Sequence, residues 1–317
     1  MSSLLHVAKI GLRTGGRPPA AVELSPEGVL AAALPQPGAQ PDYAFVALPA
    51  GALVPGIEEP NLRAPEAVAN AIREALGRVS PRSHAVTAVL PDTSVRVFVL
   101  DFDELPAKAA EAIPVLRFRL RKMVPFDVEH AGVSYQVLSQ DSTECRVLTA
   151  VMPGPILTEY ETAVREAGYE AGAVLPASLA ALEALDSLEA VLTANLSGLA
   201  LTTCVANGDD LLLYRTLDLP EDPGLRMTEI QRGIAVAAAY YEDKLGGRPR
   251  RLHYAGNRRA SEFARWIGDP DIEVMELAGG PGSGSMIGLG ASNTAGAVST
   301  AGVAGALALH GRQAGAR

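Results

Sequence analysis

A pattern of three short apolar runs occurs twice in this sequence, once at the start of each half, and it limits the choice of fold. Turn-forming Gly, Pro, Asn and Ser residues bound the runs, as is typical of strands in a meander. The runs are residues 5–12, 20–24 and 28–34 in the first half and 190–195, 199–206 and 211–219 in the second. Helical periodicity follows the strands in both halves, for example at residues 64–79 and 227–245. We therefore expect a duplicated α/β fold of two lobes with a cleft between them.

Composition excludes several classes of protein. The chain has 317 residues, 48% of them apolar, which is enough for two packed lobes and too apolar for general disorder. Its formal net charge is -9 and its aromatic content is 5%, so a basic nucleic-acid binder is not expected. The two cysteines, Cys145 and Cys204, lie in apolar runs and do not indicate a disulfide scaffold.

No pattern in the sequence indicates catalysis or a bound metal. The five histidines are scattered without the spacing of metal ligands. No Ser or Cys lies in a recognisable nucleophile elbow. Paired carboxylates, such as Asp101 with Asp103, lie in turn-like segments where solvated acids are common. We therefore expect a protein that is not an enzyme and that binds no metal.

One long uncharged segment, residues 277–311, is a candidate membrane span by charge alone. It consists mostly of Ala, Gly, Ser and Thr, whereas a spanning helix needs about 20 predominantly apolar residues. We expect residues 294–310 to form a buried helix whose small side chains permit close packing. Residues 1–12 do not read as a signal peptide, so the expected location is cytoplasmic.

Three segments carry motifs that match one known family. Residues 11–24 align without a gap with the family opening GLDIGSxSVKAVEL, residues 86–138 contain VLPDTSVRVFVLDFDELP, LRFRLRKMVPF and VSYQVL, and residues 147–182 match a strand, a helix and the sequence after it. These segments resemble the PilM proteins of type IV pilus assembly, which are relatives of the division protein FtsA. The resemblance implies a duplicated actin-like (ribonuclease H-like) fold of two lobes, with an inserted small α+β subdomain called 1C.

The resemblance also implies where the subdomains divide. The expected parts are core subdomain 1A in residues 1–91 and 153–189, subdomain 1C in 92–152, subdomain 2A in 190–293, and a C-terminal helix between the lobes in 294–317. Only a few residues separate Leu219 from the helix expected near Met227. The family usually places subdomain 2B there, so 2B is expected to be reduced or missing.

The nucleotide site that the family implies is degenerate in this chain. The family places an Asp, a Gly and a Lys at the positions of Arg13, Gly15 and Ala20, and its second phosphate loop opens with Asp-x-Gly where this chain has Asn195 to Ser197. The family's Gly-Gly in the adenosine loop corresponds to Gly256 and its neighbour. Loss of both carboxylates removes the groups that would hold Mg²⁺. We therefore expect no cofactor, neither ATP nor Mg²⁺.

The family's partner is the short cytosolic N-terminal tail of PilN, a membrane protein with a single span. The tail lies in a groove between subdomains 1C and 1A, and residues 133–138 are a plausible edge strand for it. The resemblance places the groove at Leu116, Arg117, Arg119, Pro125, Phe126, Val133, Tyr135 and Val137. The basic run 117–122 leaves three interpretations open: a solvated helix face, a surface that binds an acidic tail or anionic lipid, and nucleic-acid contact.

These observations predict a cytoplasmic scaffold of PilM type, peripheral to the inner membrane through a PilN-like partner. Other pilus assembly proteins are further candidate partners. Two alternatives stay open at this point. One is a nucleotide-switched actin-like ATPase, which retained carboxylates in the two phosphate loops would favour. The other is a component of type II secretion similar to the cytoplasmic part of GspL, whose family shares the fold.

Overall fold

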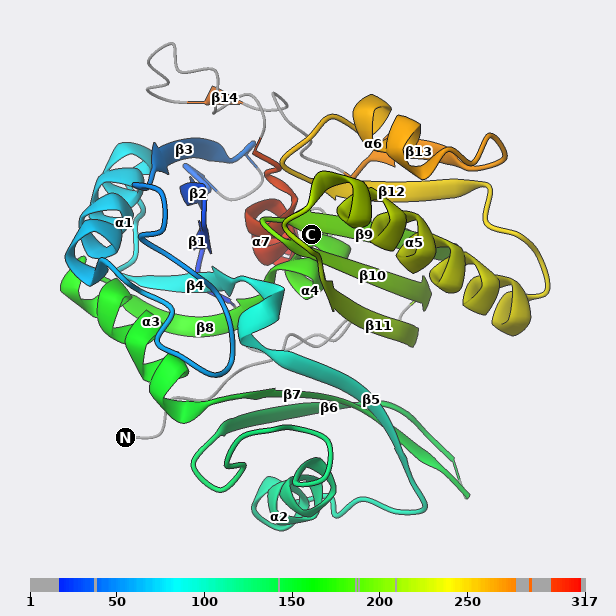
Figure 1. Ribbon diagram of the computed structural model, residues 1–317. Helices are drawn as coiled ribbons and strands as arrows, with labels where there is room; N and C mark the ends of the chain where they lie inside the picture. Colours follow the sequence, from blue (N-terminus) through cyan, green and yellow to red (C-terminus); the bar gives the residue numbers. More distant parts are fainter. Residues whose placement is uncertain are drawn as a thin grey trace.

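Two mixed β-sheets with the same strand order form the two lobes of the molecule (Figure 1). The computed structural model describes residues 17–36, 39–141, 143–185, 187, 189–208, 210–277, 285–286 and 298–314. The first sheet has the order β14-β3-β2-β1-β4-β8 and the second the order β11-β10-β9-β12-β13. The first contains β1 (Ala20–Ser25), β2 (Gly28–Ala33), β3 (Asp42–Ala47), β4 (Ala85–Leu90), β8 (Glu170–Pro176) and β14 (Ser285–Met286). The second contains β9 (Ala190–Ser197), β10 (Ala200–Asn207), β11 (Asp210–Asp218), β12 (Arg251–Gly256) and β13 (Glu273–Glu276).

The predicted duplication is present in the way the strands pair. In the first sheet β1 is antiparallel to β2 and parallel to β4. In the second sheet β9 is antiparallel to β10 and parallel to β12 in the same way. A third meander strand, β3 or β11, then follows on the outer side of each hairpin. Each strand of the second sheet therefore has a counterpart in the first, and β14 is an additional strand at the edge of the first sheet.

The first meander begins one strand later than the sequence pattern indicated. Its strands are β1, β2 and β3, whereas the predicted first strand, residues 5–12, lies outside the described residues. The third strand of the meander, β3, lies in the proline-rich stretch 35–60, which the pattern of apolar runs did not identify as a strand. The prolines at 35, 37, 41 and 49 surround this short Tyr-, Phe- and Val-containing strand, so the local composition resembles a loop.

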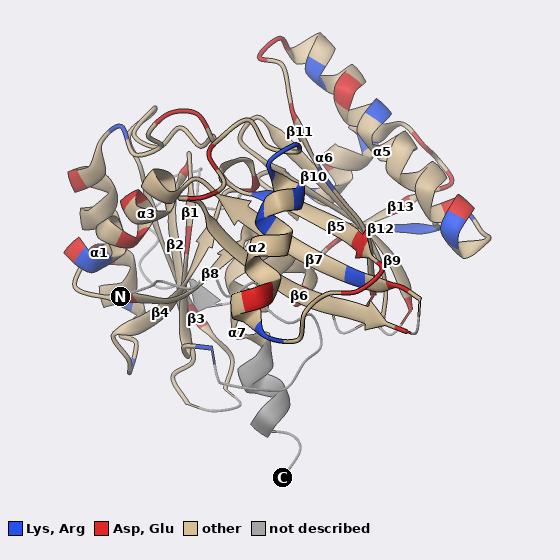
Figure 2. Ribbon diagram, turned by 90° about the horizontal axis from the view of Figure 1, so that it is seen from below, with Lys and Arg blue, Asp and Glu red and all other residues tan. Residues whose placement is uncertain are grey.

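Helices cover both faces of the first sheet and one face of the second (Figures 1 and 2). On the first sheet, α1 (Pro65–Val79) and α3 (Gly154–Glu166) pack on one face, while α4 (Ala177–Leu182) and α7 (Ala301–Ala314) pack on the other. On the second sheet, α5 (Pro223–Leu245) and α6 (Ala260–Ile267) pack on the face away from the first lobe. Apolar side chains from β10 and β11 join the main core of the first lobe, so the lobes share buried surface.

A smaller α+β unit is inserted between β4 and α3. After the short helix η1 (Asp92–Ser94), it contains β5 (Arg96–Phe102), α2 (Ala109–Leu120), β6 (Gly132–Gln140) and β7 (Cys145–Met152). The strands form an antiparallel sheet of order β5-β7-β6, on which α2 packs through Leu116 and Leu120. β6 and β7 pair antiparallel, and α2 continues through the internal Pro114.

Two helices begin at other residues than the sequence pattern indicated. Only residues 219–222 separate β11 from α5, and α5 begins at Pro223 rather than near Met227. The earlier start has a local cause, because the Asp222 side chain accepts a hydrogen bond from the backbone N–H of Leu225 and Pro223 occupies the first helical turn. The C-terminal helix begins at Ala301 rather than Thr294. Within the described ranges, no helix is long and apolar enough to span a bilayer.

Candidate functional site

The cleft between the lobes is framed by the two equivalent hairpins. Ser25 pairs with Gly28 at the turn between β1 and β2, and Ser197 pairs with Ala200 at the turn between β9 and β10. Counting back two residues from each serine places Glu23 and Asn195 at equivalent positions. The pairing with the parallel neighbours agrees, because Glu23 faces Val89 of β4 and Asn195 faces Ala255 of β12. Glu23 is therefore the counterpart of Asn195 in the first hairpin.

This geometry corrects the assignment of the first phosphate loop. Arg13 and Gly15 lie outside the described residues, and Ala20 is fully buried within β1, five residues before the turn. By the symmetry of the two hairpins, the loop equivalent to residues 198–199 is residues 26–27 between β1 and β2, one strand later than the alignment of residues 11–24 placed it. Superposing Val22-Glu23-Leu24-Ser25 on Ala194-Asn195-Leu196-Ser197 would have found Glu23 from the sequence.

The cleft encloses only a small cavity in this structure. Its volume is about 30 Å³, room for about one water molecule. Asn195, Ser197 and Gly256 are brought together here, as the sequence indicated. Leu196 and Asn257 also line the cavity. The other lining residues come from the first hairpin and from the segment before α7: Glu23, Ser25, Glu27, Leu30, Val298 and Ser299. Asn257 donates a hydrogen bond of 3.0 Å to Glu27 and thereby links the two lobes.

Glu23 is held against α7 in an environment that favours its neutral form. Its Oε2 atom is buried without a hydrogen-bond partner, and Gly302 of α7 leaves no room for a side chain beside the carboxyl group. Burial, followed by the negative charges of Asp92 and Glu27, raises the pKa of Glu23 to about 8. Near neutral pH the carboxyl group is therefore largely protonated and is a poor ligand for a cation.

A second carboxylate in the cleft, Asp92, already has a full set of partners. Its Oδ1 accepts hydrogen bonds from the Ser178 N–H (3.0 Å) and the Tyr214 hydroxyl (2.7 Å), and its Oδ2 accepts one from the Ser178 hydroxyl (2.5 Å). Asn195 approaches the same oxygen at 3.4 Å. These partners come from α4, β9 and β11, so the network connects the lobes. In the described part of the chain, no three His, Cys, Asp or Glu residues lie close enough to hold a metal ion.

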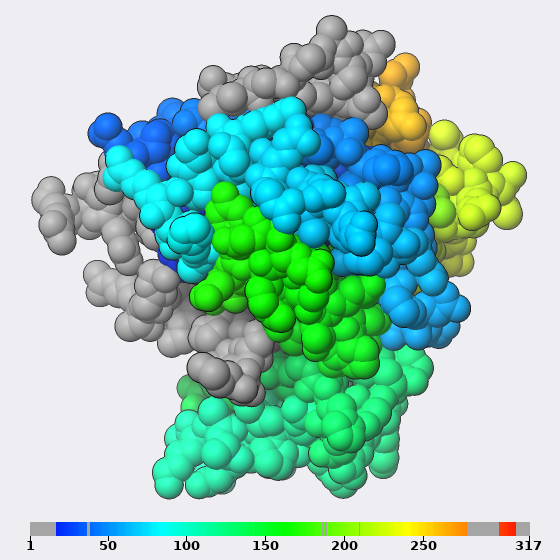
Figure 3. All heavy atoms as spheres, turned by 90° about the vertical axis from the view of Figure 1, so that its left-hand side faces the viewer, coloured from blue at the N-terminus to red at the C-terminus, as the bar shows by residue number. Residues whose placement is uncertain are grey.

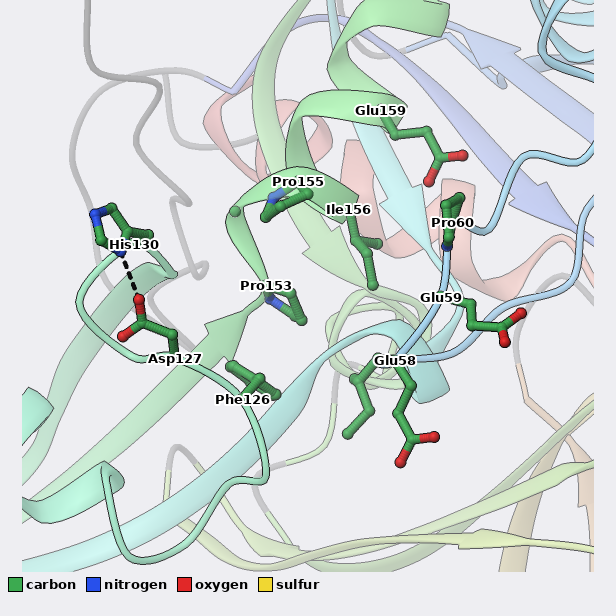
Figure 4. A pocket seen from close by; sticks show the side chains of 12 residues that line it. Glu58, Glu59, Pro60, Phe126, Asp127, His130, Pro153, Pro155, Ile156 and Glu159 are labelled. Carbon is green, nitrogen blue, oxygen red and sulfur yellow. Dashed lines mark hydrogen bonds and ion pairs between the residues drawn. The ribbon is translucent and has the colours of Figure 1, made fainter.

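A much larger hollow lies between the inserted unit and the first lobe (Figures 3 and 4). We call it the insert groove. Its volume is about 610 Å³. Its apolar wall is formed by Ile57, Pro60, Phe126, Pro153, Pro155 and Ile156, and its acidic residues are Glu58, Glu59, Asp127 and Glu159. His130 and Gly154 complete the lining, which alternates between the loop before α1, the loop before β6 and the start of α3.

Hydrogen bonds hold the first-lobe side of the insert groove in place. The Glu159 carboxylate accepts from the backbone N–H groups of Asn61 (2.8 Å) and Leu62 (2.6 Å). The buried Asn61 side chain donates to the Gly56 and Glu59 carbonyls and accepts from Tyr160 and Ser94. The loop that carries Ile57 and Glu58 is therefore fixed on both sides, which favours binding without a large ordering cost.

The other side of the insert groove is fixed by an ion pair and an arginine. The Nδ1 atom of His130 lies 2.5 Å from the Oδ2 atom of Asp127. This contact raises the pKa of His130 and lowers the pKa of Asp127. Arg117 of α2 donates to the carbonyls of Val128, Glu129 and Ala131. Arg117 thus supports the loop that lines the groove instead of facing a ligand itself.

Of the eight residues predicted for this groove, only Phe126 lines it. Leu116 and Val133 are buried in the core of the insert, and Tyr135 and Val137 pack beside Leu116. Arg119 and Pro125 are exposed but do not line the groove. The prediction missed residues 57–60 and 153–159, for which the only signal was the Pro-Gly-Pro sequence at the start of α3. β6 is an edge strand of its sheet, as expected.

No protein-family model matches the chain, and no curated protein sequence matches it either. Among solved structures, the chain is similar to a PilM-PilN type IV pilus biogenesis complex, with a TM-score of 0.69 and 17% identity over 92% of this chain and 98% of that chain. The cytoplasmic domain of EpsL, from the type II secretion system of Vibrio cholerae, follows with a TM-score of 0.48 and 14% identity over 81% of this chain and 85% of that domain. The fold is therefore the duplicated actin-like fold that the sequence predicted, in the form seen in PilM.

Proposed function

We propose that this protein is a cytoplasmic scaffold of type IV pilus assembly that binds the cytosolic N-terminal tail of a PilN-like inner-membrane protein. The insert groove is the observation that carries this proposal. It is the largest of the hollows described above, it lies between the insert and the first lobe, and its walls are fixed before any partner binds. Similarity of the fold to a PilM-PilN complex supports the same assignment.

The lining of the insert groove suggests the chemistry of the tail. Apolar side chains of an extended segment would pack against Phe126, Ile156 and the prolines. The exposed carboxylates of Glu58 and Glu59 favour a tail that also carries Lys or Arg. This charge preference is opposite to that for an acidic tail, which was one of the interpretations of the basic run 117–122. We therefore expect a basic and apolar tail.

Recognition rather than catalysis is the proposed role, because the cleft that would hold a nucleotide is nearly closed. A nucleotide would have to displace residues 298–299 and α7, and it would have to break the hydrogen bonds of Asp92. A nucleotide-switched ATPase is the second candidate, because the cleft contains two carboxyl groups, Glu23 and Asp92, although in this structure the first favours its neutral form and the second is hydrogen-bonded to other residues. Addition of Mg-ATP separates the two candidates, as described below.

Tail binding can be tested by fluorescence anisotropy. The probe is a labelled peptide that carries the cytosolic N-terminal tail sequence of a PilN-like protein. E58K/E59K should weaken binding by about fivefold or more, because it reverses two charges at the rim. E74K/E166K is a matched control: it makes the same change in net charge at exposed sites outside the groove, and Glu74, like Glu59, pairs with an arginine four residues away. Equal weakening by both variants, or no binding by the unmodified protein, would contradict the proposal.

A further inference from the structure

Helix α2 carries an exposed apolar side chain that no packing in the insert explains. Phe118 is 69% exposed, more than any other large apolar side chain in the described residues. Val115, 36% exposed, and Met123, 40% exposed, lie near it in the sequence. The opposite side of α2 is well packed, because Leu116 and Leu120 are fully buried. The outer side is therefore not needed to stabilise the insert.

Cations surround these apolar side chains. Arg119 and Lys122 are exposed, and neither forms an ion pair within the described part of the chain. Arg121 pairs with Glu129 and keeps 58% of its side chain exposed. Residues 108–122 carry five cations and one anion in a chain whose net charge is -9. The segment is thus a local exception to the charge of the whole protein.

The position of α2 leaves this side open. In Figure 1, α2 lies on the side of the insert that is far from both lobes, and Figure 2 shows the basic bands on it. None of the exposed residues named above lines the insert groove. A protruding helix cannot enclose an extended peptide, whereas it can rest on a broad, flat surface.

We propose that the outer side of α2 and of the turn that follows it, formed by Val115, Phe118, Arg119, Lys122 and Met123 and called the α2 face, contacts the surface of an anionic phospholipid bilayer. Phe118 would enter the headgroup region, where aromatic side chains are stable. Arg119 and Lys122 would lie against the phosphates, each adding attraction within a Debye length of the surface. This contact requires no partner tail, so it stands independently of the function proposed above.

Vesicle sedimentation of the full chain, with no tail peptide present, tests the α2 face. One set of vesicles contains phosphatidylcholine alone and the other contains about 30 mol% phosphatidylglycerol. The protein should sediment with the anionic vesicles only, and less so as salt is raised. R119E/K122E should weaken binding at least tenfold, since each cation near such a surface contributes about fivefold. F118S should weaken the binding that remains at high salt.

The control variant R82E/K244E makes the same change in net charge at exposed sites on the two lobes. It should change vesicle binding by less than about twofold, because its charges lie far from the α2 face. Far-UV circular dichroism and melting curves confirm that each variant is folded. Absence of binding to anionic vesicles would overturn the proposal and leave an acidic protein surface as the occupant. Equal loss in the control would also overturn it, since it would show an effect of net charge alone.

Discussion

Removal of the Arg117 guanidinium should loosen the loop that forms one wall of the insert groove. Arg117 donates to three backbone carbonyls, with distances of 2.9 Å to Glu129 and 3.0 Å to Ala131, and a third bond to Val128. Val128 and Ala131 are buried, so their carbonyls have little access to water once the guanidinium is removed. The arginine therefore acts as a fixed support between α2 and residues 128–131.

The size of the effect follows from these three bonds. A hydrogen bond with a charged partner contributes about 1.5–3 kcal/mol, but bonds that share one guanidinium are not additive. We expect R117A to lower the free energy of unfolding by about 2–4 kcal/mol. R117K should recover only part of this loss, because a single ammonium group cannot span the carbonyls as the planar fork does.

Urea denaturation followed by circular dichroism measures this loss, and R119A is the matched control on the same helix. Arg119 is exposed and has no ion-pair partner among the described residues, so R119A should change stability by less than about 0.5 kcal/mol. R117A should also weaken tail binding, because Phe126 and Asp127 adjoin the loosened loop. If R117A is no less stable than R119A, the supporting role of Arg117 is wrong.

Three further predictions concern the cleft and α7. The pKa of Glu23 is about 8 in the folded state against 4.5 ordinarily, so the folded protein retains a proton that the unfolded chain releases. The free energy of unfolding should therefore fall as pH rises from about 4.5 to 8. Melting curves of E23Q should lack this fall, and the same dependence of melting temperature on pH in E23Q would show that Glu23 does not have a raised pKa. G305A should lower the free energy of unfolding by about 2 kcal/mol or more, because its methyl group would collide with the carbonyl of Ala180. G77A is the control: its methyl group meets no neighbouring atom, so stability should be unchanged or slightly higher. Equal effects of the two variants in chemical denaturation would be inconsistent with close packing of α7 on α4. Millimolar Mg-ATP should leave the melting temperature unchanged, whereas a ligand at about 100 times its Kd would add about 2.7 kcal/mol, and a magnesium-dependent shift would favour the nucleotide-switched alternative.

Local patterns in the sequence were sufficient to predict a duplicated α/β fold of two lobes, and the family resemblance added the actin-like assignment and the insert. The turn signals around Gly198 and Gly208 predicted the three strands of the second meander, β9, β10 and β11, whereas α6 and β13 were not predicted. The prediction for the first lobe was shifted by one strand. Because prolines flank β3, its segment resembled a loop, and the apolar run at 5–12 was interpreted as a strand of the meander instead. The alignment of residues 11–24 to the family motif supported the same shifted assignment. The error became visible only from the parallel pairing of β1 with β4.

The sites were harder to predict because they are assembled from distant segments. The insert groove combines residues 57–60, 126–130 and 153–159, and no local pattern joins these segments. Arg117 was interpreted as a ligand-binding cation because its charge is visible in the sequence, while its three carbonyl partners are not. Glu23 could have been found from internal symmetry, but its raised pKa depends on Asp92 and α7, which only the folded structure places beside it.

Hydrogen–deuterium exchange with and without the tail peptide is the most direct test of the insert groove as the binding site. Binding should slow exchange in residues 57–62, 126–131 and the first turn of α3, which line the groove or adjoin it. Exchange in α5 should not change, because that helix packs on the far side of the second lobe. Protection confined to the inter-lobe cleft or to α5, with none in the groove, would contradict the account.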